Sequence, residues 1–168
     1  MMSDPTARQR CFGENKRDPA DLTPRTPTSG PWRLVRTPDP RGGPDAVAVM
    51  QTADPSQSDL ALAGVMLRCS GASFRVLIVV LEPVPPRAHP KVKLATGGTT
   101  AEFNATVLPS GAALELPDSA AQFLYGPARR ATELAIEVFA GDTMIRGTIT
   151  LAGLETALAL LTSNCPVQ

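Results

Sequence analysis

The chain contains a single histidine, His89, so a Ser–His–Asp or Cys–His site would have to use it. His89 lies in the sequence PRAHPK, a basic and proline-rich stretch with no nearby acid to orient an imidazole. The nucleophile motif G-x-S-x-G and the glycine-rich phosphate-binding motifs do not occur. We therefore interpret His89 as a solvated loop residue and predict no nucleophilic catalysis.

Two pairs of carboxylates are the remaining candidates for acid–base chemistry. Asp54 and Asp59 share the polar loop DPSQSD, and Glu133 and Glu137 lie on one face of an expected strand. The composition of the loop is typical of turns, in which Asp and Ser bond the local backbone, and its acids are too widely spaced for a calcium loop. The glutamates should face solvent. We predict no catalytic residue, no enzyme activity, no metal site and no cofactor.

The three cysteines are Cys11, Cys69 and Cys165, and no pair has the C-x-x-C spacing of a zinc site. A bridge between Cys69 and Cys165 would tie the end of the chain to a central strand and would contribute about 4–5 kcal/mol in the chain-entropy model. Such a bridge requires an oxidising compartment. The alternative is two unpaired buried thiols that act as small apolar residues.

Binding features concentrate between residues 83 and 91. The sequence PVPPR is a P-x-x-P segment followed by an arginine, a rigid extended type of ligand that docks into aromatic grooves. The cations that follow form a basic strip suited to an acidic partner, whereas aromatic residues are too few for a nucleic-acid platform. The alternative is a stiff cover over a sheet edge. The predicted binding residues are Pro83, Pro85, Pro86, Arg87, His89 and Lys91.

Alternating apolar and polar residues, together with short apolar or β-capable runs bounded by turn sequences, predict the strands that must position these groups. The pattern marks strands at 32–37, 46–52, 63–69, 74–81, 91–95, 102–108, 112–116, 133–139 and 144–151. Asp118 is expected to cap a short helix at 120–124, and leucines spaced three and four apart predict a C-terminal helix at 154–161. The expected fold is mainly β: an antiparallel β-sandwich or barrel-like sheet with a short helix and a C-terminal capping helix.

The length of 168 residues, with 43 % hydrophobic residues, fits one domain with a real core. We expect a disordered, proline-rich, basic arm at residues 1–30 and a single β-rich domain at 31–168. The longest apolar run, residues 76–81, is too short to cross a membrane, so we expect no transmembrane segment. The first residues do not form a signal peptide as written. Either the protein is cytoplasmic or this chain starts downstream of its export signal.

Three stretches together resemble a known family: the first strand PWRLVRT, the strand VMLRC, and the ending GTITLAGLETALALLTSNC. The pattern resembles the periplasmic VasI-type proteins associated with type VI secretion and, more loosely, the secreted invasion-associated locus B proteins. The chain departs from that family in residues 83–90 and in lacking a visible export signal. The same pattern also fits a separate bacterial family.

The resemblance implies a periplasmic or secreted, non-catalytic accessory domain with Cys69 and Cys165 as its bridge. Its expected partner is another protein of the cell envelope. Two alternatives stay open: a small hydrolase or carbohydrate-binding domain, and a cytoplasmic adaptor, which predicts reduced cysteines. The sequence indicates no oligomeric state.

Overall fold

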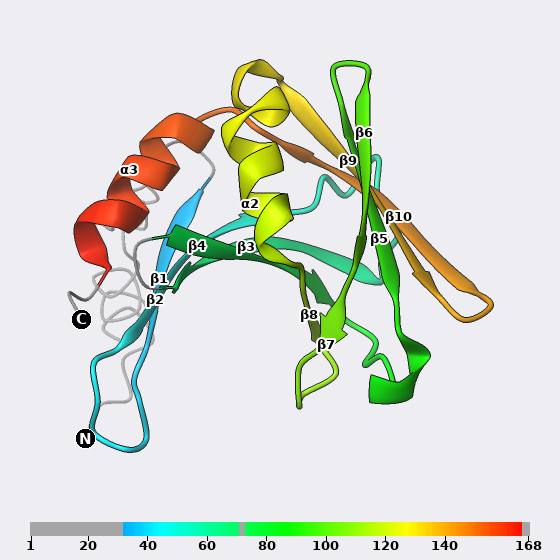
Figure 1. The fold of residues 1–168 in the computed structure, drawn as a ribbon. Coiled ribbons are helices and arrows are strands. Elements are labelled where there is room, and N and C mark those ends of the chain that lie inside the picture. Colours follow the sequence, from blue (N-terminus) through cyan, green and yellow to red (C-terminus); the bar gives the residue numbers. More distant parts are fainter. Residues whose placement is uncertain (1–31, 71–72, 166–168) are drawn as a thin grey trace, which may run out of the picture.

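A computed structural model describes residues 32–70 and 73–165 of the chain. The expected arm at 1–30, including Cys11, lies outside the described residues. The described strands form two sheets, one of six strands and one of four, and every neighbouring pair of strands is antiparallel. Figure 1 shows the smaller sheet packed over one part of the larger sheet. The mainly β, sandwich-like prediction is therefore confirmed.

The strand bounds follow the alternating sequence pattern closely. The six-stranded sheet has the order β1 (Arg33–Thr37), β2 (Ala46–Thr52), β3 (Leu62–Ser70), β4 (Ser73–Val80), β8 (Ala113–Glu115) and β7 (Thr106–Val107). The four-stranded sheet has the order β10 (Thr143–Thr150), β9 (Glu133–Ala140), β5 (Lys91–Thr96) and β6 (Thr99–Asn104). Most strands contact a sequence neighbour through a short connection, as expected for antiparallel sheets.

The strand expected at 102–108 is interrupted at Ala105, and this break separates the two sheets. β6 pairs with β5 in the small sheet, whereas β7 pairs with β8 in the large one. The Ala105 N–H donates to the Pro90 carbonyl at 2.9 Å instead of joining either ladder. The chain thus changes sheets here, and the two ladders remain separate, so the fold is not a closed barrel.

Two α-helices accompany the sheets: α2 (Asp118–Tyr125) and α3 (Leu154–Asn164). The expectation that Asp118 caps the first helix is wrong, because Pro117 occupies the cap position in an extended conformation and Asp118 is the first helical residue. There its negative charge still favours the helix N-terminus. Neither helix, and no other helix of the described residues, is long and apolar enough to cross a membrane.

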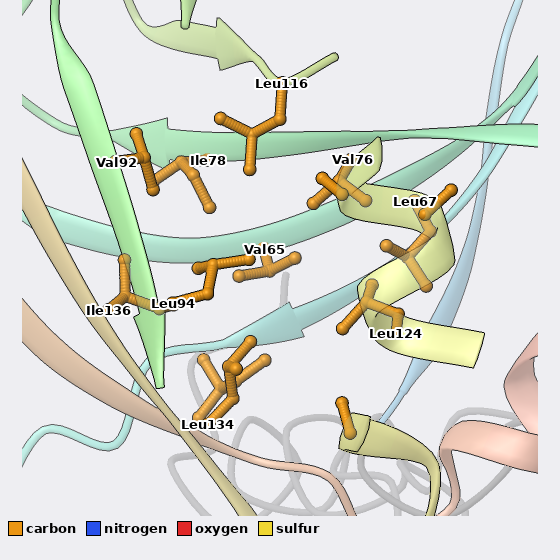
Figure 2. Close-up of a cluster of buried hydrophobic side chains, with 14 of the residues drawn as sticks. Val65, Leu67, Val76, Ile78, Val92, Leu94, Leu116, Leu124, Leu134 and Ile136 are labelled. Atoms are coloured by element: carbon orange, nitrogen blue, oxygen red, sulfur yellow. The ribbon is translucent and has the colours of Figure 1, made fainter. Parts of the chain in front are cut away.

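The core lies between the concave face of the large sheet and three covering elements: the small sheet, α2 and α3 (Figure 1). Figure 2 shows side chains from both sheets and from α2 directed toward one another. Because strand side chains alternate, each strand places every second residue in this layer. The core residues labelled in Figure 2 are Val65, Leu67, Val76, Ile78, Val92, Leu94, Leu116, Leu124, Leu134 and Ile136.

Candidate functional site

The Asp54 carboxylate belongs to a local turn in the β2–β3 loop. It accepts hydrogen bonds from the Ser56 N–H at 2.9 Å, the Ser56 hydroxyl at 2.7 Å and the Gln57 amide at 2.9 Å. These bonds, with the Ser56 hydroxyl the strongest contributor, hold the pKa of Asp54 below its usual value. A general acid needs the opposite shift. The geometry therefore assigns Asp54 a turn role.

Asp59, at the other end of the same loop, completes the edge of β10. Its N–H donates to the Arg146 carbonyl at 2.8 Å, and its carboxylate accepts from the Arg146 N–H at 2.8 Å. Ser58 acts likewise, with its hydroxyl accepting from the Thr148 N–H at 3.0 Å. Polar side chains thus supply the acceptors that a neighbouring strand would offer, which protects an open sheet edge.

The second acid pair, Glu133 and Glu137, lies on the outer face of the small sheet, as the strand period predicts. Glu137 stands 3.5 Å from Arg146 and is in register with Lys93 on the next strand. Glu133 is exposed and Glu137 is half-buried on the outer surface of the sheet. In residues 32–70 and 73–165, no group of three or more His, Cys, Asp or Glu could hold a metal ion.

The predicted binding segment, residues 83–91, forms an exposed connection between β4 and β5. Two buried residues anchor it: Val84, whose N–H donates to the Gly111 carbonyl at 2.8 Å, and Pro90, which receives the Ala105 bond. Between these anchors lies the short 3-10 helix η1 (Pro86–Ala88), so the segment is not an extended polyproline helix throughout. The six predicted binding residues are all exposed: Pro83, Pro85, Pro86, Arg87, His89 and Lys91.

His89 ends η1 in the left-handed conformation, with φ of 44°. This conformation is uncommon for a residue with a Cβ, although His adopts it more readily than most. It reverses the chain so that Pro90 can be buried while the imidazole stays exposed. The structure therefore presents His89 to solvent at the surface of the segment rather than within a catalytic cavity.

Exposed apolar side chains gather near this segment. Phe139 and Met144 are 38 % and 41 % exposed and lie in one cross-strand row with Lys91 on the outer face of the small sheet. Leu81, two positions before the segment, is 66 % exposed, and Leu60 is 87 % exposed. The Leu81 N–H donates to the Ala61 carbonyl at 2.8 Å, which places Leu60 close by. We call Leu60, Leu81, Phe139 and Met144 the apolar end.

The apolar end was not predicted from the sequence as a surface. One signal was available: Phe139 follows the period of Glu133 and Glu137, so alternation places its ring on the solvent face. Leu60 and Leu81 flank β3 and β4, and only their side-by-side pairing in the sheet brings them together. The pairing of β3 with β4 and of β9 with β10 assembles these two neighbouring pairs.

Cys69, near the end of β3, and Cys165, directly after α3, have their sulfur atoms at disulfide-bonding distance, as predicted. The Cα atoms are 5.7 Å apart, within the range of protein disulfides. Cys69 faces the core side of the sheet, in step with Val65 and Leu67. The pair therefore ties the terminal helix onto the concave face.

Comparisons with protein-family models, with curated proteins and with solved structures found no match for this chain.

Proposed function

We propose that this chain is a non-catalytic interaction domain that binds another protein of the cell envelope through the apolar end and the 83–91 segment. The observation that carries this proposal is the gathering of exposed large apolar side chains. Within the described residues there are five: Leu60, Leu81, Phe139, Met144 and Tyr125. Four of them, the apolar end, lie as two neighbouring pairs on elements next to the segment, whereas a monomer normally scatters such residues singly.

The chemistry of the segment favours a partner with an apolar anchor site rimmed by acidic groups. Three prolines present apolar rings on a backbone held at both ends, so little conformational entropy remains to be lost on binding. Arg87 and His89 add donors next to those rings. Lys91 already lies 3.7 Å from Glu102, an exposed pair that stabilises little and that a partner carboxylate can replace.

Export is the second part of the proposal. The Cys69–Cys165 distance supports it, because a bridge of this kind persists in oxidising compartments. The resemblance to the VasI-type periplasmic proteins supports it as well. The roles of Asp54 and Asp59 in turn and edge bonding support a non-catalytic domain, since the candidate acids are engaged with backbone groups.

Site-specific photocrosslinking in cells of the source organism tests the interaction surface. A benzophenone amino acid replaces Leu81 in one chain, Phe139 in a second and Tyr125 in a third. Tyr125 is the matched control, because it is an exposed large side chain that packs on Phe74 at the far end of β4 from Leu81. We expect the same partner at Leu81 and Phe139 and none at Tyr125. Equal products at all three positions would refute the assignment.

A charge reversal tests the role of the basic segment. Arg87→Glu should weaken the Leu81 crosslink, whereas Arg130→Glu, an exposed arginine after α2, should leave it unchanged. For export, cysteine alkylation in the same cells should modify Cys69 and Cys165 only after reduction. If both thiols are modified without reduction, the cytoplasmic adaptor is the correct alternative.

A further inference from the structure

A polar hollow of about 340 Å3 lies between α2 and the hairpin end of β3 and β4. Its size falls within the range of small-ligand sites. One wall comes from positions 118, 121, 122 and 125 of α2, which the helical period places on one face. The other wall comes from the ends of the two strands. The lining residues are Ser70, Ser73, Phe74, Arg75, Asp118, Ala121, Gln122 and Tyr125.

Tyr125 gives the hollow an aromatic surface. Its side chain is 46 % exposed, and its ring packs against the buried Phe74, with the ring centroids 5.1 Å apart and the planes tilted by 57°. This contact holds the ring in place while part of the side chain stays accessible. A fixed aromatic ring with a polar tip suits a ligand that is apolar on one side and polar at its rim.

The charges around the hollow cancel. The Arg75 guanidinium lies 3.4 Å from Glu115 and 3.5 Å from Asp118, and Arg68 lies 2.8 Å from Glu115. Two arginines thus face two carboxylates. An anion such as phosphate would have to compete with carboxylates already in place, so the hollow offers paired donors and acceptors rather than net positive charge.

Hydroxyls, an amide and the ion pair together provide both donors and acceptors around one aromatic ring. A pyranose sugar has the matching chemistry, with a C–H face that stacks on an aromatic ring and a rim of hydroxyls that donate and accept. We propose that this hollow binds one residue of a neutral glycan. The site goes beyond the proposed protein interaction and lies at the opposite end of β4 from the apolar end.

Tyr125 is the only tyrosine of the chain, so the NMR signals of ring-labelled tyrosine report on this site alone. The full chain, with its cysteines oxidised, is titrated with glucose, N-acetylglucosamine and chitobiose, and separately with inorganic phosphate. We expect a saturable shift with at least one sugar, with a Kd of about 1–10 mM for so small a ligand. A shift that saturates with phosphate alone, or with none of these probes, would overturn the proposal.

Two glutamine variants separate binding from nonspecific shifts. Gln122→Ala should raise the Kd for the sugar about 5- to 10-fold by removing one amide contact. Gln57→Ala is the matched control, because Gln57 is an exposed glutamine in the β2–β3 loop. An unchanged Kd in Gln122→Ala would contradict the assignment. Backbone amide spectra confirm that each variant is folded, and the photocrosslinks at Leu81 report separately on the proposed function.

Discussion

Removing the bridge between Cys69 and Cys165 should lower the free energy of unfolding by about 4.7 kcal/mol. The two residues are 96 positions apart, so the bridge closes a loop that includes most of the domain. In the chain-entropy model, a loop of this length removes about 4.7 kcal/mol of conformational freedom from the unfolded state at 25 °C. Since domains are stable by only about 5–15 kcal/mol, the loss would be a large fraction of the total.

The helix should nevertheless stay docked in a Cys69→Ala/Cys165→Ala chain. Leu154, Leu158 and Leu161 of α3 are all buried, and each contributes about 1.5–3 kcal/mol through its burial. Because those contacts do not depend on the bridge, the expected change is in stability rather than in structure. Far-UV circular dichroism of the double variant should therefore match that of the oxidised chain.

Urea unfolding measures the effect. With a slope of about 1.5 kcal/mol/M, the midpoint of the double variant should fall by about 3 M. Reductant should shift the wild-type midpoint by a similar amount and leave the double variant unchanged. Cys11→Ala serves as the control, since it removes a cysteine but keeps the bridge. A difference below about 1 kcal/mol between oxidised wild type and double variant would refute the loop-entropy argument.

Two further predictions concern the β2–β3 loop. Ser58→Ala removes the acceptor of the Thr148 N–H, so it should lower the free energy of unfolding by about 1–2 kcal/mol and speed amide hydrogen exchange at Thr148. Unchanged exchange at Thr148 would show that the hydroxyl does not protect the edge of β10. Ser56→Ala should raise the pKa of Asp54 toward its usual value, which carboxyl NMR titration measures. Because the folded pKa is lowered, the stabilisation by Asp54 is present above its unfolded pKa and is lost as the pH falls through the folded pKa. An identical Asp54 titration curve in the wild type and in Ser56→Ala would contradict the role given to the Ser56 hydroxyl.

The strands were predictable because alternation is a local property. β9 illustrates this: Leu134, Ile136 and Val138 are buried on one face, in the period of two that the sequence displays. The terminal helix was predictable for the same reason, from leucines at helical spacing. Each signal lies within about a dozen residues, and the structure adds only the partner that each apolar face meets.

The roles of the acids were only partly predictable, because they depend on contacts distant in sequence. The turn around Asp54 was expected from the loop composition, in which Asp and Ser bond the local backbone, and the observed partners, Ser56 and Gln57, are indeed local. The hydrogen bond that the Arg146 N–H donates to the Asp59 carboxylate joins residues 87 positions apart, and the loop composition contains no sign of it. The break at Ala105 was missed likewise, since the alternation continues through it while the chain changes sheets.

The hollow beside α2 was not predicted either, for a related reason. In the sequence, Gln122 falls within the short helix expected at 120–124, Tyr125 falls just after it, and Ser70 and Ser73 fall between two expected strands. Their chemistry emerges when α2 packs against the start of β4. Nothing in a linear pattern specifies which helix face meets which strand end, so concave sites built from two elements are the features that sequence reasoning reaches last.

The two proposed surfaces can be separated by mutation, and this provides the sharpest test of the functional reasoning. Leu81 follows Phe74 by seven positions, a distance of about 23 Å along β4 and its extension. Sites that far apart with no shared side chains should respond independently. Leu81→Asp should abolish the crosslink formed by the benzophenone amino acid at position 139 and leave the sugar Kd unchanged. Gln122→Ala should raise the sugar Kd and leave that crosslink unchanged. If either variant alters both readouts, the two surfaces are not independent, and a single extended interface would have to replace them.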